Sequence, residues 1–392
     1  MLKLKEDVFY VGAINPNLRV FDIIMRTEYG TTYNAYLVRG EKTALIEAVN
    51  TKYFGQMVDK IEEIVPLKSI DYIIFNHTEP DHSGGVAAII EANPEVEIIG
   101  TAAAIKNVGN VCNIDFKSRT VKTGDTLDIG NGLVFEFITA PNLHWPDSMF
   151  TYLPSRKTVF TCDFLGAHYC EPLITDDEIT YPNYYEEAFE YYFDKIFSPF
   201  KKFVLAGLEK LEGLDFDIVC CSHGPILKNR YKKAMELYKE WSTPKINEKN
   251  VAVFYVSAYG YTRSAANAFV DNFRKLGIKA EAYDLINCDD KIITEEFENA
   301  TGILLGSPTI NHDALKPVWD LLSGIDCVAN KGKVFGIFGS YGWSGEACKM
   351  LEDRCVAMGL KKAFESYKFL MNPREEDFKE IEKLAMTFTQ NL

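Results

Sequence analysis

The chain has 392 residues, of which 47% are apolar and 25% are charged, and its formal net charge is −14. The length predicts about two domains, and the composition is that of an ordinary soluble globular protein. The acidic balance argues against binding of nucleic acid, because proteins that bind the phosphate backbone present basic surfaces.

Short strands dominate the sequence from Val8 to about Trp241. We expect strands at residues 33–38, 43–46, 72–75, 97–99, 134–138, 150–153, 158–161 and 217–220. Helical patterns appear at about residues 53–64, 86–92, 101–109, 184–196, 199–211 and 227–240. Because the strands occur in runs, with helices interspersed but without regular βαβ alternation, this half is predicted to be a layered α+β sandwich.

The stretch from Tyr72 to His82 is an apolar strand that runs into a loop of potential metal ligands, namely His77, Glu79, Asp81 and His82. The loop lies at the carboxyl end of a strand, where α/β proteins place their chemistry, and a helix is expected to begin near Val86. In an extended stretch, three of these side chains point to one side and His82 points to the other. The arrangement therefore favours two metals over one.

Three further candidate ligands each follow an expected strand in a turn-rich loop, and they are His144, Asp163 and His223. A single loop histidine is more often solvated than a ligand, and a single aspartate usually caps a helix. The chain has only six histidines, however, and four of them occupy these strand-end positions. His168 is a separate candidate, either as a hydrogen-bond or proton donor beside the metals or as a structural residue.

The polar segment at residues 242–250 contains a proline and lies where the pattern changes. We place the domain boundary there, so that residues 1–248 form one domain and residues 249–392 form the other. Strands are then expected at residues 251–256, 279–284, 302–305, 333–338 and 363–369, and helices at 264–276, 315–323, 345–358 and 375–387. This regular alternation predicts a doubly wound parallel sheet.

Three loops that follow strands of this second half are candidates for a phosphate-containing cofactor. The first joins a strand to a helix, and its backbone amides and hydroxyls suit a terminal monophosphate; it contains Ser257, Tyr259, Gly260, Tyr261, Thr262, Arg263 and Ser264. The other two supply Ser307, Pro308, Thr309, Ile310, Asn311, Ser340, Tyr341, Gly342, Trp343, Ser344 and Gly345. A glycine-rich loop alone often serves only a tight turn, but three at successive strand ends favour a binding site.

The nine cysteines include no C-x-x-C pair, which argues against an iron–sulfur, zinc-ribbon or rubredoxin module within the chain. No apolar run approaches the roughly 18 residues of a membrane span, and the first residues lack the apolar centre of a signal peptide. We therefore expect a cytoplasmic protein with reduced thiols.

The ligand pattern resembles that of the metallo-β-lactamase superfamily, in which H-x-H-x-D-H is followed by a histidine, an aspartate and a last histidine. Glu79 stands where the zinc hydrolases have their second histidine. With this substitution and the flavodoxin-like second half, the whole chain resembles the flavodiiron proteins. The resemblance implies an N-terminal metallo-β-lactamase-like αββα sandwich that holds two irons, followed by a flavodoxin-like doubly wound parallel sheet that holds FMN in its three loops.

The same resemblance implies a division of the ligands. One iron would be held by His77, Glu79 and His144, and the other by Asp81, His82 and His223. Asp163 would bridge the two, whereas the residue at the position of His82 is displaced from the metal in some relatives. Oxygen and imidazole ligands without thiolate suit iron. Two ferrous ions would balance three carboxylates and one hydroxide, so that the reduced centre carries no net charge in a low-dielectric pocket.

The resemblance further implies an oxidoreductase that reduces dioxygen to water, nitric oxide to nitrous oxide, or both. Reduction of dioxygen to two waters takes four electrons, two from the ferrous pair and two from reduced FMN. The family places the FMN of one subunit against the irons of another, so we expect a head-to-tail homodimer or a dimer of such dimers. The expected electron donor is a rubredoxin-like protein or a reduced deazaflavin coenzyme.

Two other interpretations remain open from the sequence. One is a di-zinc hydrolase of the metallo-β-lactamase fold, fused to a flavodoxin-like module, in which the metals activate water. The other is a flavin electron carrier with a structural metal and no gas-consuming activity. Metal content and gas consumption would distinguish the three.

Overall fold

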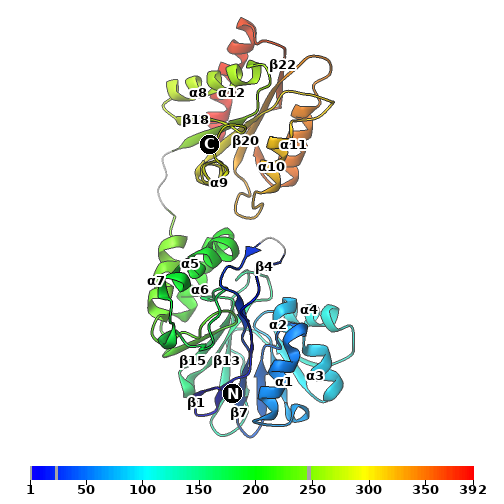
Figure 1. Cartoon of the computed structure of the whole chain (residues 1–392), viewed down its shortest axis with the longest axis vertical. Coiled ribbons are helices and arrows are strands. Elements are labelled where there is room, and N and C mark those ends of the chain that lie inside the picture. Colours follow the sequence, from blue (N-terminus) through cyan, green and yellow to red (C-terminus); the bar gives the residue numbers. More distant parts are fainter. Residues whose placement is uncertain (1, 23–24, 245–248) are drawn as a thin grey trace. The chain divides into compact units, whose positions relative to one another are not determined.

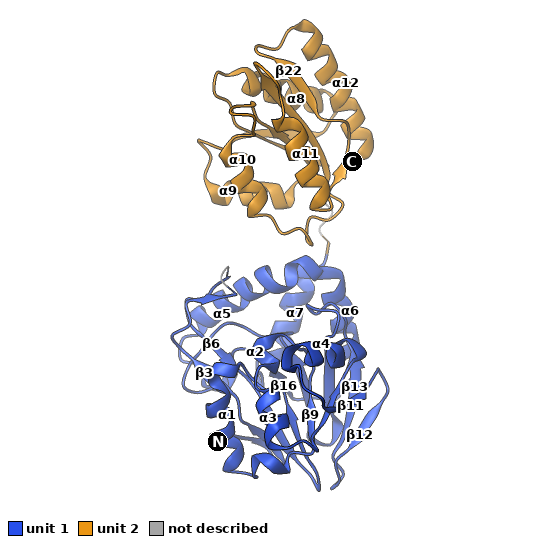
Figure 2. Ribbon diagram, turned by 90° about the vertical axis from the view of Figure 1, so that its right-hand side faces the viewer, with its two compact units in different colours: residues 1–243 blue, residues 244–392 orange. Residues whose placement is uncertain are grey.

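The computed structural model describes residues 2–22, 25–244 and 249–392, and it divides into two compact units, residues 1–243 and 244–392 (Figure 2). The predicted boundary between residues 248 and 249 adjoins residues 245–248, which lie outside the described residues. Within the described ranges, no helix combines the length and the apolarity needed to cross a membrane.

The first unit contains two large sheets. One has the order β1-β2-β7-β8-β9-β10-β11, with bounds Leu2–Lys5, Val8–Tyr10, Tyr36–Arg39, Thr43–Ile46, Tyr72–Ile74, Glu97–Gly100 and Lys117–Thr120. The other has the order β12-β13-β14-β15-β16, with bounds Thr126–Asp128, Val134–Thr139, Met149–Leu153, Thr158–Cys162 and Ile218–Cys221. Two short ribbons pair β3 (Ala13–Asn15) with β6 (Thr31–Tyr33), and β4 (Val20–Phe21) with β5 (Met25–Arg26).

The central strands of this unit are buried on both faces, because one face packs on the other sheet and the opposite face packs on helices. In β7, Tyr36 and Val38 join the core between the sheets, whereas Leu37 joins the core beneath the helices. Figure 1 shows α1 (Phe54–Glu62), α2 (Pro80–Ser83), α3 (Val86–Ala92) and α4 (Ala102–Cys112) on one side of the sheets, and α5 (Pro182–Tyr192), α6 (Lys201–Leu211) and α7 (Tyr231–Ser242) on the other. The predicted αββα sandwich is confirmed.

The structure changes some of the predicted elements. The single strand expected at residues 33–38 is two strands, β6 and β7, because the chain passes between them from a small ribbon to the large sheet. The edge strand β11 was missed, since its four residues are all exposed and carry no apolar alternation.

The second unit is a parallel sheet with the order β18-β17-β19-β20, in which β21 and β22 both lie beside β20. The strand bounds are Lys279–Asp284, Asn250–Tyr255, Gly302–Gly306, Val334–Tyr341, Lys361–Lys362 and Tyr367–Leu370. The first two strands in the chain exchange places in the sheet, which is the flavodoxin-like order and confirms the predicted architecture. Binding sites in such sheets lie beyond the carboxyl ends of the strands.

Helices cover both faces of this sheet. One face packs against α8 (Tyr261–Lys275) and α12 (Glu375–Asn391), which contribute Phe269 and Phe388 to that core. The other packs against α9 (Asp290–Asn299), α10 (Lys316–Ser323) and α11 (Ala347–Ala357), which contribute Phe297, Val318 and Leu351. The helix α9 was not predicted from the sequence.

Candidate metal and flavin sites

The candidate metal ligands lie on loops and one short helix at the strand ends of the first unit. His77 and Glu79 follow β9, whereas Asp81 and His82 lie on α2. The predicted extended conformation is therefore wrong from Pro80 onward, because the fixed φ of proline suits the first position of a helix. The remaining strand ends place His144 after β13, Asp163 after β15 and His223 after β16.

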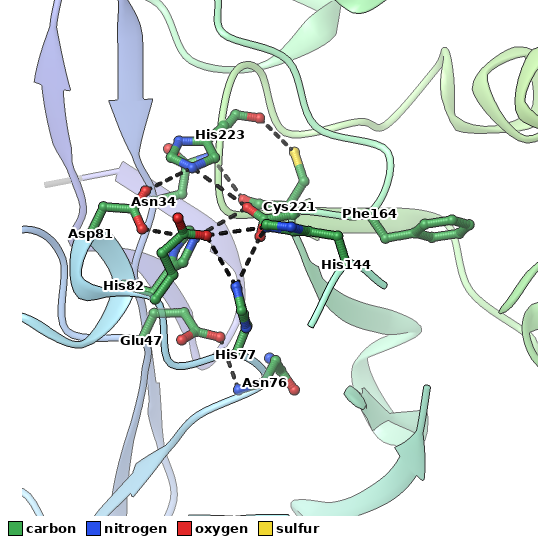
Figure 3. A network of polar contacts seen from close by, with 12 residues as sticks. Asn34, Glu47, Asn76, His77, Asp81, His82, His144, Phe164, Cys221 and His223 are labelled. Atoms are coloured by element: carbon green, nitrogen blue, oxygen red, sulfur yellow. Dashed lines mark hydrogen bonds and ion pairs between the residues drawn. The ribbon is translucent and has the colours of Figure 1, made fainter. Parts of the chain in front are cut away.

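Four of these side chains form a first group, His77, Glu79, His144 and Asp163, whose donor atoms all lie within 4.8 Å of one another. The Nε2 atoms of His77 and His144 lie 3.3 and 3.2 Å from the same oxygen, Oε2 of Glu79. His144 Nε2 is also 3.5 Å from Oδ2 of Asp163. Two imidazoles and two carboxylates thus come together, and Figure 3 shows the side chains of His77 and His144 pointing toward one another.

Asp81, His82 and His223 form a second group, and Asp163 also faces it. His223 Nε2 lies 3.0 Å from Asp81 Oδ2, and His82 Nε2 lies 3.4 Å from Asp81 Oδ1. The Oδ1 atom of Asp163 lies 3.1 Å from His82 Nε2, while its Oδ2 atom faces the first group. One carboxylate therefore presents an oxygen to each group.

Several buried polar atoms of the cluster lack a hydrogen-bond partner, namely both carboxylate oxygens of Asp81, His82 Nε2 and Asp163 Oδ2. An unsatisfied buried polar group costs on the order of 1–3 kcal/mol, and the presence of several at one place therefore indicates a cation-binding site. The donors of the two groups are four imidazoles and three carboxylates, which is a set that suits iron. The thiol of Cys162 also lies near His82 and Asp163, but burial raises its pKa well above the usual value, so it is not a thiolate. The residues present fit a two-metal centre.

The carboxylates also hold protons on the histidines when no metal is bound. Burial alone would lower the pKa of His82, but the carboxylates of Asp81 and Asp163 outweigh this effect and raise it to about 10. Burial is likewise outweighed at His77, where hydrogen bonds to Asp147 and Glu79 raise the pKa well above its usual value. Since metal ligands must be deprotonated, a bound cation would displace these protons.

Asp147 was not predicted as a site residue, although it is the partner that orients His77. Its two oxygens lie 3.1 and 3.2 Å from His77 Nδ1, and it accepts further bonds from the backbone N–H and hydroxyl of Thr78. Burial would raise the pKa of Asp147, but these hydrogen bonds hold it below its usual value. The carboxylate therefore fixes the proton on Nδ1 and leaves Nε2 to face the cluster.

His168 lies beside the second group without joining either set of converging donors. Its Nδ1 atom is 2.9 Å from the hydroxyl of Thr31, and its ring centroid is 4.8 Å from that of His223. Its Nε2 atom is buried and has no hydrogen-bond partner. Burial, and then the proximity of His223, lower the pKa of His168 well below its usual value, so the imidazole is neutral.

Three other polar residues at the cluster were missed by the sequence reasoning. The hydroxyl of Tyr192 donates to Asp163 Oδ1 over 3.1 Å. Glu47, which follows β8, is fully buried and accepts a bond from the backbone of Asn76, and burial raises its pKa to about 8. Burial and a hydrogen bond to Glu79 raise the pKa of Asp22 to about 6. Only Glu47, as a strand-end carboxylate, carried a signal in the sequence.

The second unit has a cavity of about 470 Å³ at the carboxyl ends of its strands, within the range of roughly 300–1,000 Å³ usual for cofactor sites. The predicted residues that line it are Ser257, Tyr259, Tyr261, Thr262, Pro308, Thr309, Ile310, Asn311, Ser340, Tyr341, Gly342, Trp343 and Ser344. Ala258, His312 and Met371 line it as well and were not predicted. The predicted residues Gly260, Arg263, Ser264, Ser307 and Gly345 are not part of the lining.

The lining fits FMN. The left-handed Gly260, with φ of +86°, turns the chain into α8, and the N-terminal end of this helix lies beside the hydroxyls of Ser257 and Thr262, where a phosphate could bind. The hydroxyl of Ser257 accepts a hydrogen bond of 3.2 Å from the backbone N–H of Arg263. Arg263 instead pairs with Asp284 at 3.1 Å. The side chains of Tyr259 and Trp343 are 83% and 94% exposed, so these aromatic rings are available to cover a planar ligand.

Comparison with known proteins shows similarity along the whole chain. Residues 31–224 match the ODP family beta lactamase profile, and residues 253–383 match flavodoxin. The flavo-diiron protein FprA2 of Clostridium acetobutylicum is 44% identical over 399 aligned residues, which cover 100% of this chain and 99% of that protein. An anaerobic nitric oxide reductase flavorubredoxin of Vibrio vulnificus is 33% identical, with 92% of this chain and 74% of that protein covered.

A solved structure, the rubredoxin oxygen:oxidoreductase of Desulfovibrio gigas, superposes with a TM-score of 0.71 at 30% sequence identity. The superposition covers 99% of this chain and 98% of that one. The similarity therefore includes both units rather than one domain alone.

Proposed function

The chain belongs to the flavodiiron protein family, and from that premise we propose that it reduces dioxygen, nitric oxide or both. The family consists of oxidoreductases with a di-iron site, and the flavodoxin domain indicates FMN. One relative is named for oxygen and another for nitric oxide, so the name of a relative does not select the gas.

The observation that carries the proposal is the position of Asp163 between two groups of ligands. His77, Glu79 and His144 would hold one iron, and Asp81, His82 and His223 would hold the other, with Asp163 shared. When bound, the irons supply an open site for the gas together with two electrons, and reduced FMN supplies two more. His82 is included because its Nε2 atom points at the same carboxylates as the other ligands.

The side chains around the ligands fix their orientation. Asp147 keeps the proton of His77 on Nδ1, and the backbone oxygen of Thr32 accepts from Nδ1 of His223 over 2.6 Å. Both imidazoles are thereby held with Nε2 toward the centre. Tyr192 donates to the oxygen of Asp163 that faces the second group, which holds the rotamer of the shared carboxylate.

We assign His168 the role of a neutral hydrogen-bonding group beside the second iron. Its contact with the Thr31 hydroxyl leaves Nε2 free, and its lowered pKa argues against a permanent imidazolium there. It would donate or accept a hydrogen bond at Nε2, according to its tautomer, without adding positive charge to the centre.

In the second unit, Ser257, Thr262 and the first turn of α8 would bind the phosphate of FMN, and the loops after β19 and β20 would hold its ring. We propose that a rubredoxin-like protein or a reduced deazaflavin coenzyme delivers the electrons. We further propose that two chains form a head-to-tail dimer, alone or as a dimer of dimers, which brings the flavin of one chain to the irons of the other.

The test combines metal analysis with rapid kinetics. The purified chain should contain two irons and one FMN, and the fully reduced protein should be reoxidised by dioxygen or by nitric oxide in stopped-flow mixing. Two zincs together with hydrolase activity would instead support the hydrolase interpretation. Bound FMN with no consumption of either gas would support an electron carrier.

A further inference from the structure

The turn from Ile310 to Asp313 has an uncommon backbone conformation for its sequence. Its central residues, Asn311 and His312, both have positive φ, at +54° and +62°. The ends of the turn are joined by two backbone hydrogen bonds of 3.1 Å between Ile310 and Asp313. Tight turns with two left-handed central residues favour Asn-Gly, because glycine has no Cβ that clashes in this region. A histidine at the glycine position therefore calls for a reason other than the turn itself.

The imidazole of His312 is held at the rim of the flavin cavity by a carboxylate from another loop. Its Nδ1 atom lies 2.8 Å from Oε1 of Glu346, which precedes α11. The hydroxyl of Ser344 donates to the other carboxylate oxygen over 2.7 Å. This cluster of His312, Glu346 and Ser344 joins the loop after β19 to the loop after β20. His312 and Ser344 both line the cavity.

This arrangement determines what the other ring nitrogen can offer. A carboxylate only accepts hydrogen bonds, so the Nδ1 atom of His312 must carry a proton. In the hydrogen bonds that the structure describes, Nε2 takes no part. A neutral imidazole would offer a lone pair there, and reduced flavin carries an N5–H donor that oxidised flavin lacks. A protonated imidazole would offset the negative charge of reduced flavin. Either form favours reduced FMN.

The other charged groups near the turn are already engaged. The carboxylate of Asp313 accepts bonds from the backbone of Ala314 and the indole of Trp319. The ammonium group of Lys368 donates to the backbone oxygens of Ser344 and Gly345. Of the charged or titratable groups described around the turn, His312 is thus the one with a polar atom, Nε2, that is outside the described hydrogen bonds.

We propose that His312, held by Glu346, contacts the isoalloxazine ring and favours reduced over oxidised FMN. The inference rests on the proposed binding of FMN. A purely structural role, in which the cluster only joins the two loops, would change the affinity for both redox states equally and leave the midpoint potential unchanged.

The test uses the full chain with FMN bound and measures the flavin midpoint potential by spectroelectrochemistry at one pH. His312→Gly and His312→Asn both suit a left-handed turn, so both variants should fold at least as well as the unmodified chain. In each variant the preference for reduced over oxidised FMN should fall about tenfold. This change lowers the midpoint potential by about 30 mV for a two-electron couple. The control is Asp353→Asn, which removes a charge from the exposed face of α11, where Asp353 pairs with Lys349, and should leave the potential unchanged.

The outcomes separate this inference from the proposed function. Unchanged potentials in both His312 variants, with one FMN bound per chain, would overturn the inference alone. Failure of the unmodified chain to bind FMN would overturn the proposed function together with the inference. A lowered potential in His312→Gly but not in His312→Asn would also overturn it, because the effect would then come from the turn and not from the imidazole.

Discussion

The imidazole of His77 donates from Nδ1 to the carboxylate of Asp147, 3.1 Å away, and both side chains are completely buried. Asp147 lies three residues beyond His144, so the segment that supplies one ligand also orients another. The proposed iron site therefore depends on a residue that touches no iron.

We expect Asp147→Asn to weaken iron binding about 10- to 100-fold, which is the usual cost of losing the partner of a metal-bound histidine. The amide can still bond to Thr78, so the loop should keep its shape while the proton on His77 Nδ1 loses its charged acceptor. Iron affinity would be measured by competition with a chelator. Asp115→Asn, on an exposed loop, is the matched control, and equal affinities in the two variants would contradict the role of Asp147.

The convergence of the proposed ligands could be predicted from sequence because they follow apolar strands, and the carboxyl ends of strands gather side chains at one edge. Asp147 could not be predicted, because its contact with His77 spans 70 residues and depends on how β13 and β14 pair with the rest of the unit. The orientation of His82 depended on Pro80, which turns the chain into a helix where strand alternation had been expected.

At the proposed flavin site, too, some residues could be predicted from the sequence and others could not. Its three predicted loops follow strands with clear apolar patterns, whereas Met371 follows the short strand β22, whose burial is irregular. His312 carried no signal, since its role depends on a turn conformation and on a carboxylate 34 residues away.

Glu79 is the proposed ligand that distinguishes this chain from the zinc hydrolases of the same fold. We expect Glu79→His to shift the preference of the site from iron toward zinc, because a nitrogen donor replaces an oxygen that lies near both His77 and His144. The same variant should lose gas reduction. Elemental analysis after expression with both metals gives the direct measurement. Retention of two irons and full activity would refute the role assigned to Glu79.

Trp343 should contribute to FMN binding without contributing to folding. Its side chain lines the cavity but is 94% exposed, so Trp343→Ala removes little buried surface. We expect FMN to bind about tenfold more weakly, which corresponds to about 1.4 kcal/mol, while the thermal midpoint of the apoprotein stays unchanged. Quenching of flavin fluorescence reports the dissociation constant. Tyr181→Ala, an exposed aromatic change in the other unit, should have no effect on it.

The stability of the metal-free protein and the extra stability gained on metal loading should respond to pH in opposite directions. In the metal-free protein, Asp81 and Asp163 raise the pKa of His82 to about 10, from an ordinary value of 6.5, against the opposing effect of burial. A folded-state pKa above the unfolded one stabilises the protein below pH 6.5, and this stabilisation is lost as the pH rises toward 10. Burial raises the pKa of Glu47 to about 8, from an ordinary value of 4.5. This group therefore also makes the folded state less stable as the pH rises from about 4.5 to about 8.

Thermal melts from pH 6.5 to pH 10 should therefore show the metal-free protein losing stability. Metal binding requires deprotonated histidines, so the extra stability gained on loading the protein should increase over the same range. If His82 is not a ligand, it keeps its proton when metal is bound, and the loaded protein should retain the downward slope from this residue. His82→Gln separates the two cases. In both cases this variant should reduce the loss of stability that the metal-free protein shows as the pH rises. It should weaken metal binding only if His82 is a ligand.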